Sequence, residues 1–106
     1  MRNKPVIPNK RAELDIDAAF EYYLTEAGAS VAIDFVNGLE KAIQHISNNP
    51  LIGSPRYAYE LGLPGLRSWP LRKFPYLIFY VDLEQYVEVW RVLHSHADIP
   101  KWIRDA

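Results

Sequence analysis

Cysteine is absent from this chain of 106 residues. Its absence excludes disulfide bonds and cysteine-based zinc sites, and it is typical of proteins that work in the reducing cytoplasm. Long apolar runs are missing as well, since the longest, Tyr76 to Val81, is far shorter than the roughly 20 residues of a membrane span. The first ten residues contain no apolar segment like that of a signal peptide. We therefore expect a cytoplasmic protein without a membrane segment.

An excess of charge of one sign is also missing. The net charge of −1 argues against a strongly basic nucleic-acid-binding protein. The cations are nevertheless unevenly distributed, because Arg56, Arg67, Arg72 and Lys73 all fall within a stretch in which Glu60 is the one acidic residue. This stretch is either a modest basic patch or a set of ordinary solvated charges beside strands.

The chain does contain enough apolar material for one compact domain. Hydrophobic residues make up 49% of the sequence, a share typical of globular proteins. Seven Tyr, four Phe and three Trp supply large surfaces for burial. Because 106 residues leave no room for a second core, residues 1–106 are expected to form a single domain.

Two consecutive segments have the periodicity of amphipathic helices. Asn9 is expected to cap the first helix, Gly28 to end it, and Ser30 to cap the second, which ends at the Asn-Asn-Pro sequence of residues 48–50. The short link between them predicts an antiparallel helical hairpin. The apolar positions at helical spacing are Ile16, Ala19, Phe20, Tyr23, Leu24 and Ala27 in the first segment, and Ala32, Phe35, Val36, Leu39, Ala42, Ile43 and Ile46 in the second.

Four strands are predicted, one before and three after the hairpin. The first is a short edge strand around Val6, because prolines on both sides limit its pairing. A loop rich in Gly and Pro at residues 51–64 leads to strands at residues 66–71, 76–81 and 86–94, of which the middle one is apolar on both faces and therefore central. The predicted fold class is α+β, with the N-terminal edge strand and the α-helical hairpin packed on a small antiparallel β-sheet.

Alternation along the last strand predicts which of its residues are buried. Val87, Val89 and Leu93 are expected to share one face of the sheet. The segment that follows is expected to form a short helix or turn, in which Trp102 and Ile103 fold back on the sheet edge.

No strong catalytic or cofactor-binding motif is present. The sequence lacks a Gly-rich phosphate loop, a G-x-S-x-G motif and an H-E-x-x-H motif, so no cofactor is expected. His94 and His96 are expected to share a face at the end of the last strand, and with Asp98 they form a conceivable metal-binding set. Two histidines without a third well-placed ligand are more often ordinary exposed side chains, so no metal site is expected.

A set of cations is the other candidate site. Arg67, Arg72 and Lys73 are predicted on or beside the first strand after the hairpin, and Arg91 on the last strand. Arg91 has the parity of the buried residues of its strand. This favours a structural role, in which the arginine either extends its guanidinium from the core to solvent or forms an ion pair in the core.

An alternative interpretation makes some of these residues catalytic. Cleavage of RNA by its own 2′-hydroxyl needs a base, an acid and cations that stabilise the phosphorane. His94 or His96 would transfer the protons, and Arg67 and Arg91 would supply the charge. The spacing of these residues along the chain does not decide between the structural and the catalytic interpretation.

Four longer segments are more distinctive, and they occur in a fixed order along the chain. They are AELDIDAAFEYYLTEAG, NNPLIGSPRY with Pro50 and Gly53, GLRSWPLRKFPYLIFYVD with Tyr80 near its end, and VEVWRVLHSHADIP with His94, Asp98, Ile99 and Pro100. From about Pro8 to Ile103, these segments resemble the helices, P-x-x-G turn, strand pair and closing strand of the RelE/ParE superfamily of toxins.

The resemblance implies the toxin of a type II toxin–antitoxin system, bound in a hetero-oligomer by a cognate antitoxin. RelE-like members cut mRNA on the ribosome with a dense basic cluster, whereas ParE-like members inhibit DNA gyrase by protein contact. Because neutralisation of phosphates supplies most of the affinity for RNA, the low charge favours the ParE-like branch and a non-enzymatic protein. The alternative is a ribosome-dependent endoribonuclease that uses Arg67, His94 and His96. The candidate residues for contact with the target are Arg67, Arg72, Lys73, Arg91 and His94.

One departure from the superfamily pattern leaves a third possibility open. Members commonly have an arginine just before the aspartate of the last segment, where this chain has Ala97. In this third possibility, the protein is a member of the superfamily that binds its antitoxin but is not toxic.

Overall fold

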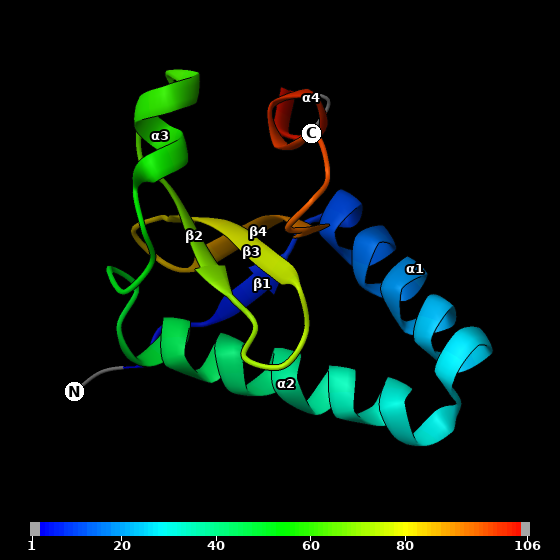
Figure 1. Cartoon of the computed structure of the whole chain (residues 1–106). Coiled ribbons are helices and arrows are strands. Elements are labelled where there is room, and N and C mark those ends of the chain that lie inside the picture. The colour runs from blue at the N-terminus through cyan, green and yellow to red at the C-terminus, as the bar shows by residue number, and fades with distance from the viewer. Residues whose placement is uncertain (1–2, 105–106) are drawn as a thin grey trace.

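The computed structural model describes residues 3–104, in which four strands and four helices are present (Figure 1). In chain order these are β1 (Val6–Pro8), α1 (Lys10–Ala27), α2 (Ala29–Asn48), α3 (Arg56–Leu61), β2 (Leu66–Pro70), β3 (Tyr76–Asp82), β4 (Val87–His94) and α4 (Ile99–Arg104). Within this part of the chain, every helix is too short or too polar to traverse a lipid bilayer.

The strands form one sheet in the order β1-β4-β3-β2. As predicted, β2, β3 and β4 pair in antiparallel fashion, β3 is an inner strand and β1 is an edge strand. The direction of β1, which the sequence pattern left open, is parallel to β4. Parallel pairing is possible because three helices and two strands separate β1 from β4 in the chain, so no tight turn has to join them.

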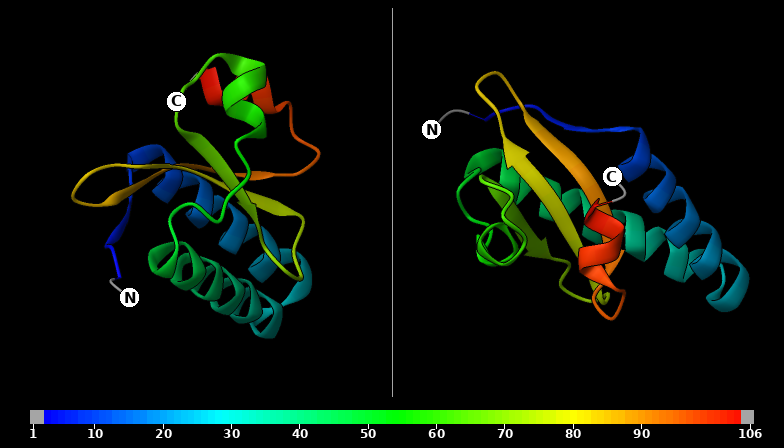
Figure 2. Two further views of the ribbon diagram at one scale, coloured as in Figure 1. Left: turned by 90° about the vertical axis from the view of Figure 1, so that its left-hand side faces the viewer. Right: turned by 90° about the horizontal axis from the view of Figure 1, so that it is seen from above.

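The predicted helical hairpin of α1 and α2 covers one face of the sheet (Figure 2). The Asn9 side chain accepts a hydrogen bond from the N–H of Ala12 at 2.9 Å, which confirms it as the N-cap of α1. Gly28, with a φ of +97°, ends α1 and directly precedes Ala29 of α2. The prediction that Ser30 caps α2 is wrong. Ser30 lies inside the first turn of α2, because a single glycine makes the whole connection between the helices.

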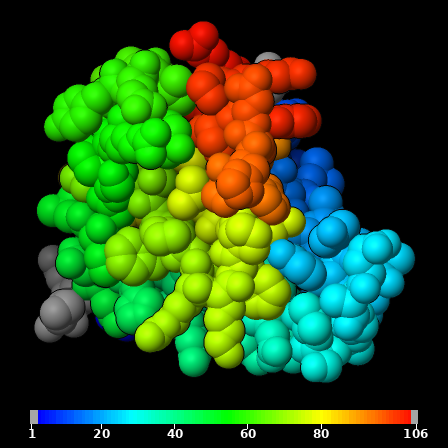
Figure 3. All heavy atoms as spheres, viewed as in Figure 1, coloured from blue at the N-terminus to red at the C-terminus, as the bar shows by residue number. Residues whose placement is uncertain are grey.

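The opposite face of the sheet is covered by α3 and α4, which lie next to each other in Figures 1 and 3. The predicted loop at residues 51–64 is wrong in part, since it contains α3, whose six residues are too few to show helical periodicity. Ile103 folds back as expected, but on the face of the sheet and not on its edge. Trp102, in contrast, stays 40% exposed.

The sheet is therefore the middle layer of three, with a core cluster on each side. The cluster between the sheet and the hairpin contains Ala12, Ala19, Phe35, Leu39, Ala42, Ile46, Leu71, Ile78, Tyr80, Val87, Val89 and Val92. The cluster under α3 and α4 contains Leu66, Phe79, Leu93, Ile99 and Ile103. The apolar character of β3 on both faces follows from this arrangement, because each face of that strand contributes to one cluster.

A β-bulge interrupts the pairing of β3 with β4. Phe79 lies opposite Arg91, and the next residue of β3, Tyr80, lies opposite Val89. Trp90 is therefore an extra residue in β4 without a partner across the ladder.

The bulge changes which residues of β4 share a face. Val87 and Val89 face the hairpin together with Val92, three positions further on, while Leu93 belongs to the cluster under α3 and α4. The predicted grouping of Leu93 with Val87 and Val89 is wrong, because strict alternation of side chains assumes a regular strand.

Candidate functional site

The arginine of β2 holds the segment after α2 against the sheet. From its Nη1 atom, Arg67 donates hydrogen bonds to the carbonyl oxygens of Gly53 at 2.7 Å and Leu51 at 3.2 Å. On the neighbouring strand, the hydroxyl of Tyr80 donates to the carbonyl oxygen of Pro50 and accepts from the N–H of Gly53, both at 2.8 Å. The guanidinium of Arg67 is therefore engaged by its own chain.

Where Arg67 and Tyr80 bind the loop, there is no space for a side chain on Gly53, the glycine of the P-x-x-G turn. A Cβ atom at Gly53 would lie 2.5 Å from the hydroxyl oxygen of Tyr80 and 3.0 Å from the carbonyl oxygen of Ser68. Burial raises the pKa of the Tyr80 hydroxyl, so this group stays protonated and able to donate at neutral pH.

We expect Tyr80→Phe to lower the free energy of unfolding by about 1–3 kcal/mol, because the buried N–H of Gly53 then lacks its acceptor. Urea denaturation at pH 7 measures the loss. Because the pKa of Tyr80 is raised in the folded state, its contribution is full below the ordinary value of 10.0 and is lost as the pH rises through the folded-state pKa. Tyr59→Phe is the matched control, since Tyr59 is 82% exposed. Equal losses in the two variants would contradict the anchoring role of Tyr80.

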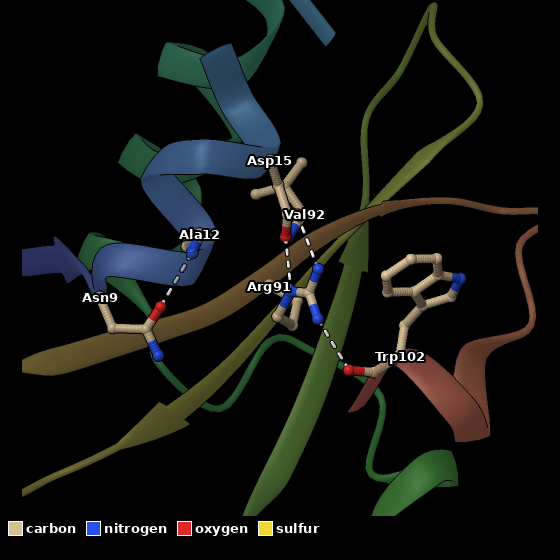
Figure 4. A network of polar contacts seen from close by, with 6 residues as sticks. All are labelled: Asn9, Ala12, Asp15, Arg91, Val92 and Trp102. Atoms are coloured by element: carbon tan, nitrogen blue, oxygen red, sulfur yellow. Dashed lines mark hydrogen bonds and ion pairs between the residues drawn. The ribbon is translucent and has the colours of Figure 1, made fainter. Parts of the chain in front are cut away.

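Arg91 is buried in an ion pair (Figure 4). Its Nε and Nη2 atoms donate to the two carboxylate oxygens of Asp15 at 2.7 and 2.8 Å, and its Nη1 atom donates to the carbonyl oxygen of Trp102 at 2.7 Å. Asp15 also accepts from the backbone N–H of Val92 at 3.0 Å. Arg91 therefore links α1, β4 and α4, and the structure supports its interpretation as an ion-paired arginine of the core.

A hollow of about 340 Å³ opens beside this ion pair, between α1, the end of β4 and α4. Tyr22 and Trp102 line it with exposed fractions of 58% and 40%. His94 and Ala97 also line it. The superfamily commonly has an arginine at this position. Because this chain has Ala97 there, the position adds no charge to the hollow.

His94 and His96 lie close together, but only His94 belongs to the strand. His94 ends β4, and its ring centroid lies 5.3 Å from that of Tyr76. His96 lies in the following turn, with its ring 5.5 Å from that of His94 and its backbone N–H donating to His94 Nδ1 at 3.1 Å. Within residues 3–104, no group of three or more side chains that could hold a metal ion is present.

Arg72 and Lys73 lie exposed in the turn between β2 and β3, which reaches over α2 in Figure 1. Together with Lys41 and Asp34 of α2, they line a hollow of about 210 Å³. Lys41 was not predicted as a site residue. It adds a third cation to this surface because α2 and the turn meet in the fold.

The candidate residues therefore occupy three separate places. In the sheet, Arg67 of β2 lies opposite Tyr80 of β3, and His94 of β4 lies opposite Tyr76 of β3, on the other side of that strand. The four-residue offset along β3 alone separates the two backbones by about 13 Å. Arg67 is turned toward the loop carbonyls and Arg91 toward Asp15, so the structure does not bring Arg67, Arg91 and His94 around one phosphate.

Comparisons with known proteins agree with the resemblance seen in the sequence. Residues 6–99 match the family model described as ParE toxin of type II toxin-antitoxin system, parDE. The fold is similar to that of a chain in the solved structure described as the chromosomal ParDE TA system from P. aeruginosa. That match has a TM-score of 0.71 and 18% sequence identity, and it covers 86% of this chain and 95% of the other. No curated protein sequence matches the chain.

Proposed function

This chain belongs to the ParE toxin family of type II toxin–antitoxin systems, and on that basis we propose that it inhibits DNA gyrase by protein–protein contact. A cognate antitoxin neutralises it by binding it in a hetero-oligomer. Gyrase and the antitoxin are cytoplasmic, so the toxin acts there as well. Inhibition of this kind requires no catalysis by the toxin and depends on the surface that it presents.

The placement of the cations is the observation that supports this proposal over mRNA cleavage. Two of the arginines that a nuclease would use are held by their own chain, Arg67 by loop carbonyls and Arg91 by Asp15. A catalytic arginine must instead be free to meet charge that develops on the phosphate. With a net charge of −1, the chain also has little electrostatic attraction for ribosomal RNA.

We expect the purified wild-type protein to stop the negative supercoiling of relaxed plasmid by DNA gyrase, and the His94→Ala variant to do the same. Neither protein is expected to cut mRNA in the presence of ribosomes. His94 packs on Tyr76, four residues along β3 from the position opposite Arg67, and its loss removes no catalytic group in this proposal. Agarose gels of plasmid topoisomers and of end-labelled mRNA measure the two activities side by side.

Two outcomes would contradict the proposal in different ways. Cleavage of mRNA by the wild type that His94→Ala abolishes would make the protein an endoribonuclease of the RelE kind. Normal growth of cells that express the wild type without antitoxin, together with unimpeded gyrase, would show a member of the family that has lost toxicity. Addition of the antitoxin to the gyrase reaction is the matched control, since it should restore supercoiling.

A further inference from the structure

A groove with an apolar floor and a cationic rim runs between α2 and the β2 edge of the sheet. Its main part, of about 490 Å³, is lined by Gly38, Lys41, Ala42, His45, Trp69, Pro70, Leu71 and Arg72. It continues into the hollow of about 210 Å³ that Asp34, Asn37, Lys73 and Phe74 help to line, and the two share Gly38, Lys41 and Arg72. We call the two together the α2–β2 groove.

The floor of the α2–β2 groove is apolar. Ala42 and Leu71 are only 4% and 5% exposed and belong to the core cluster under the hairpin. Trp69, half-buried on β2, forms one wall of the groove. Its ring centroid lies 6.3 Å from that of His45 on α2. Gly38 presents no side chain, and a Cβ there would meet only Phe74, at 3.9 Å. The groove therefore offers a place for one apolar side chain of a partner.

The rim of the groove is cationic. Lys41, Arg72 and Lys73 are all exposed, and within residues 3–104 none of the three takes part in an ion pair. The one acidic side chain that lines the groove is Asp34, at its far end. Cations that form no ion pair with the described residues of their own chain are complementary to an acidic partner.

The outer edge of β2 offers no free N–H group to a partner strand. The N–H and the carbonyl of Ser68 on the outer edge of β2 are both paired with Ser54, at 3.0 and 2.8 Å. The N–H of Leu66 donates to the carbonyl of Leu63, and Pro70 has no N–H. Because this edge has no free N–H to donate, the side chains of the groove are the main groups available for contact.

We infer that the α2–β2 groove is the surface that contacts gyrase, and that it takes an apolar side chain of gyrase flanked by carboxylates. This inference rests on the proposed function. A protein partner fits better than DNA, because a phosphate backbone attracts the cations but has no group that fills the apolar floor. The inference selects Arg72 and Lys73 from the contact candidates and adds Lys41 and Trp69.

The test compares two double variants that lower the net charge equally. Arg72→Glu with Lys73→Glu reverses the charge of the rim, while Lys10→Glu with Arg11→Glu makes the same change on the exposed first turn of α1. We expect the rim variant to need a concentration on the order of tenfold higher, or more, for half-inhibition of supercoiling by purified gyrase. The α1 variant should match the wild type. Thermal melting confirms that each protein is folded, and Arg72→Gln with Lys73→Gln replaces the rim variant if that one is not.

Trp69→Ala tests the apolar wall of the groove without a change of charge, and it should also weaken inhibition and direct binding to immobilised gyrase. Equal inhibition by the rim variant, the α1 variant and the wild type would overturn the groove as the contact surface and leave gyrase as the target. Failure of the wild type to inhibit gyrase would overturn the proposed function and this inference with it. A rim-dependent gel shift of linear duplex DNA without gyrase would show that the groove binds nucleic acid, which also overturns the inference.

Discussion

Asp15→Ala is expected to lower the free energy of unfolding by about 3–5 kcal/mol, because it leaves the buried guanidinium of Arg91 without its carboxylate. Arg91 is 3% exposed, so water cannot replace the two hydrogen bonds that Asp15 accepts from it. The backbone N–H of Val92 loses its acceptor at the same time. Urea denaturation of the two proteins, followed by circular dichroism, measures the difference.

A double variant separates two contributions to the free energy of unfolding: the cost of burying Arg91 without its carboxylate, and the net stabilisation that the ion pair provides. Replacing both partners with apolar residues, as in Asp15→Leu with Arg91→Met, should cost much less than Asp15→Ala, because no charge remains buried. Asp17→Ala is the matched control, since Asp17 is exposed on the same helix. If Asp15→Ala unfolds at the same urea concentration as Asp17→Ala, the ion pair does not hold α1, β4 and α4 together.

The elements that the sequence predicts best are those with long, regular patterns. The helical spacing of apolar residues predicts α1 and α2, and the apolar run of β3 predicts an inner strand, because each pattern extends over several turns or several strand pairs. The features missed are short or irregular. They include α3, whose six residues contain none that is fully buried, and the bulge at Trp90, which depends on the register against β3.

The candidate surfaces were harder to predict because their parts lie far apart in the chain. The position of Arg91 in its strand predicts a structural arginine, but its ion pair with Asp15, 76 positions earlier, depends on how α1 crosses β4. From the sequence alone, Arg67 looks like an exposed cation on a strand. The carbonyl of Gly53 comes within hydrogen-bond distance of it only through the path of the loop after α2. The α2–β2 groove likewise exists only because the turn that carries Arg72 folds over Lys41.

These placements also bear on the proposed function of a chain of nearly neutral charge. Two of its arginines stabilise the fold, through the loop after α2 and through the junction of α1 with α4. The cations that remain unpaired at the rim of the α2–β2 groove are few, but they surround an apolar floor. A small number of charges beside a buried apolar contact is typical of a protein interface and too few for tight binding of RNA.

Phe79→Ala and Phe35→Ala are each expected to lower the free energy of unfolding by about 3–5 kcal/mol, because both side chains are fully buried and each leaves a cavity. Phe35 belongs to the cluster under the helical hairpin, and Phe79 to the cluster under α3 and α4. A large loss at Phe79 therefore tests whether the second face of the sheet is a true core. Urea denaturation measures both losses, with Leu14→Ala, at a position 52% exposed, as the control.

The two losses should also be nearly independent, since the sheet separates the two clusters. Because two alanine substitutions together would unfold a domain of ordinary stability, Phe35→Leu and Phe79→Leu serve for the double variant. Their losses are expected to add to within about 0.5 kcal/mol. A small loss at Phe79, close to that of the Leu14 control, would mean that α3 and α4 cover the sheet only loosely and that the stability of the protein comes from the hairpin side.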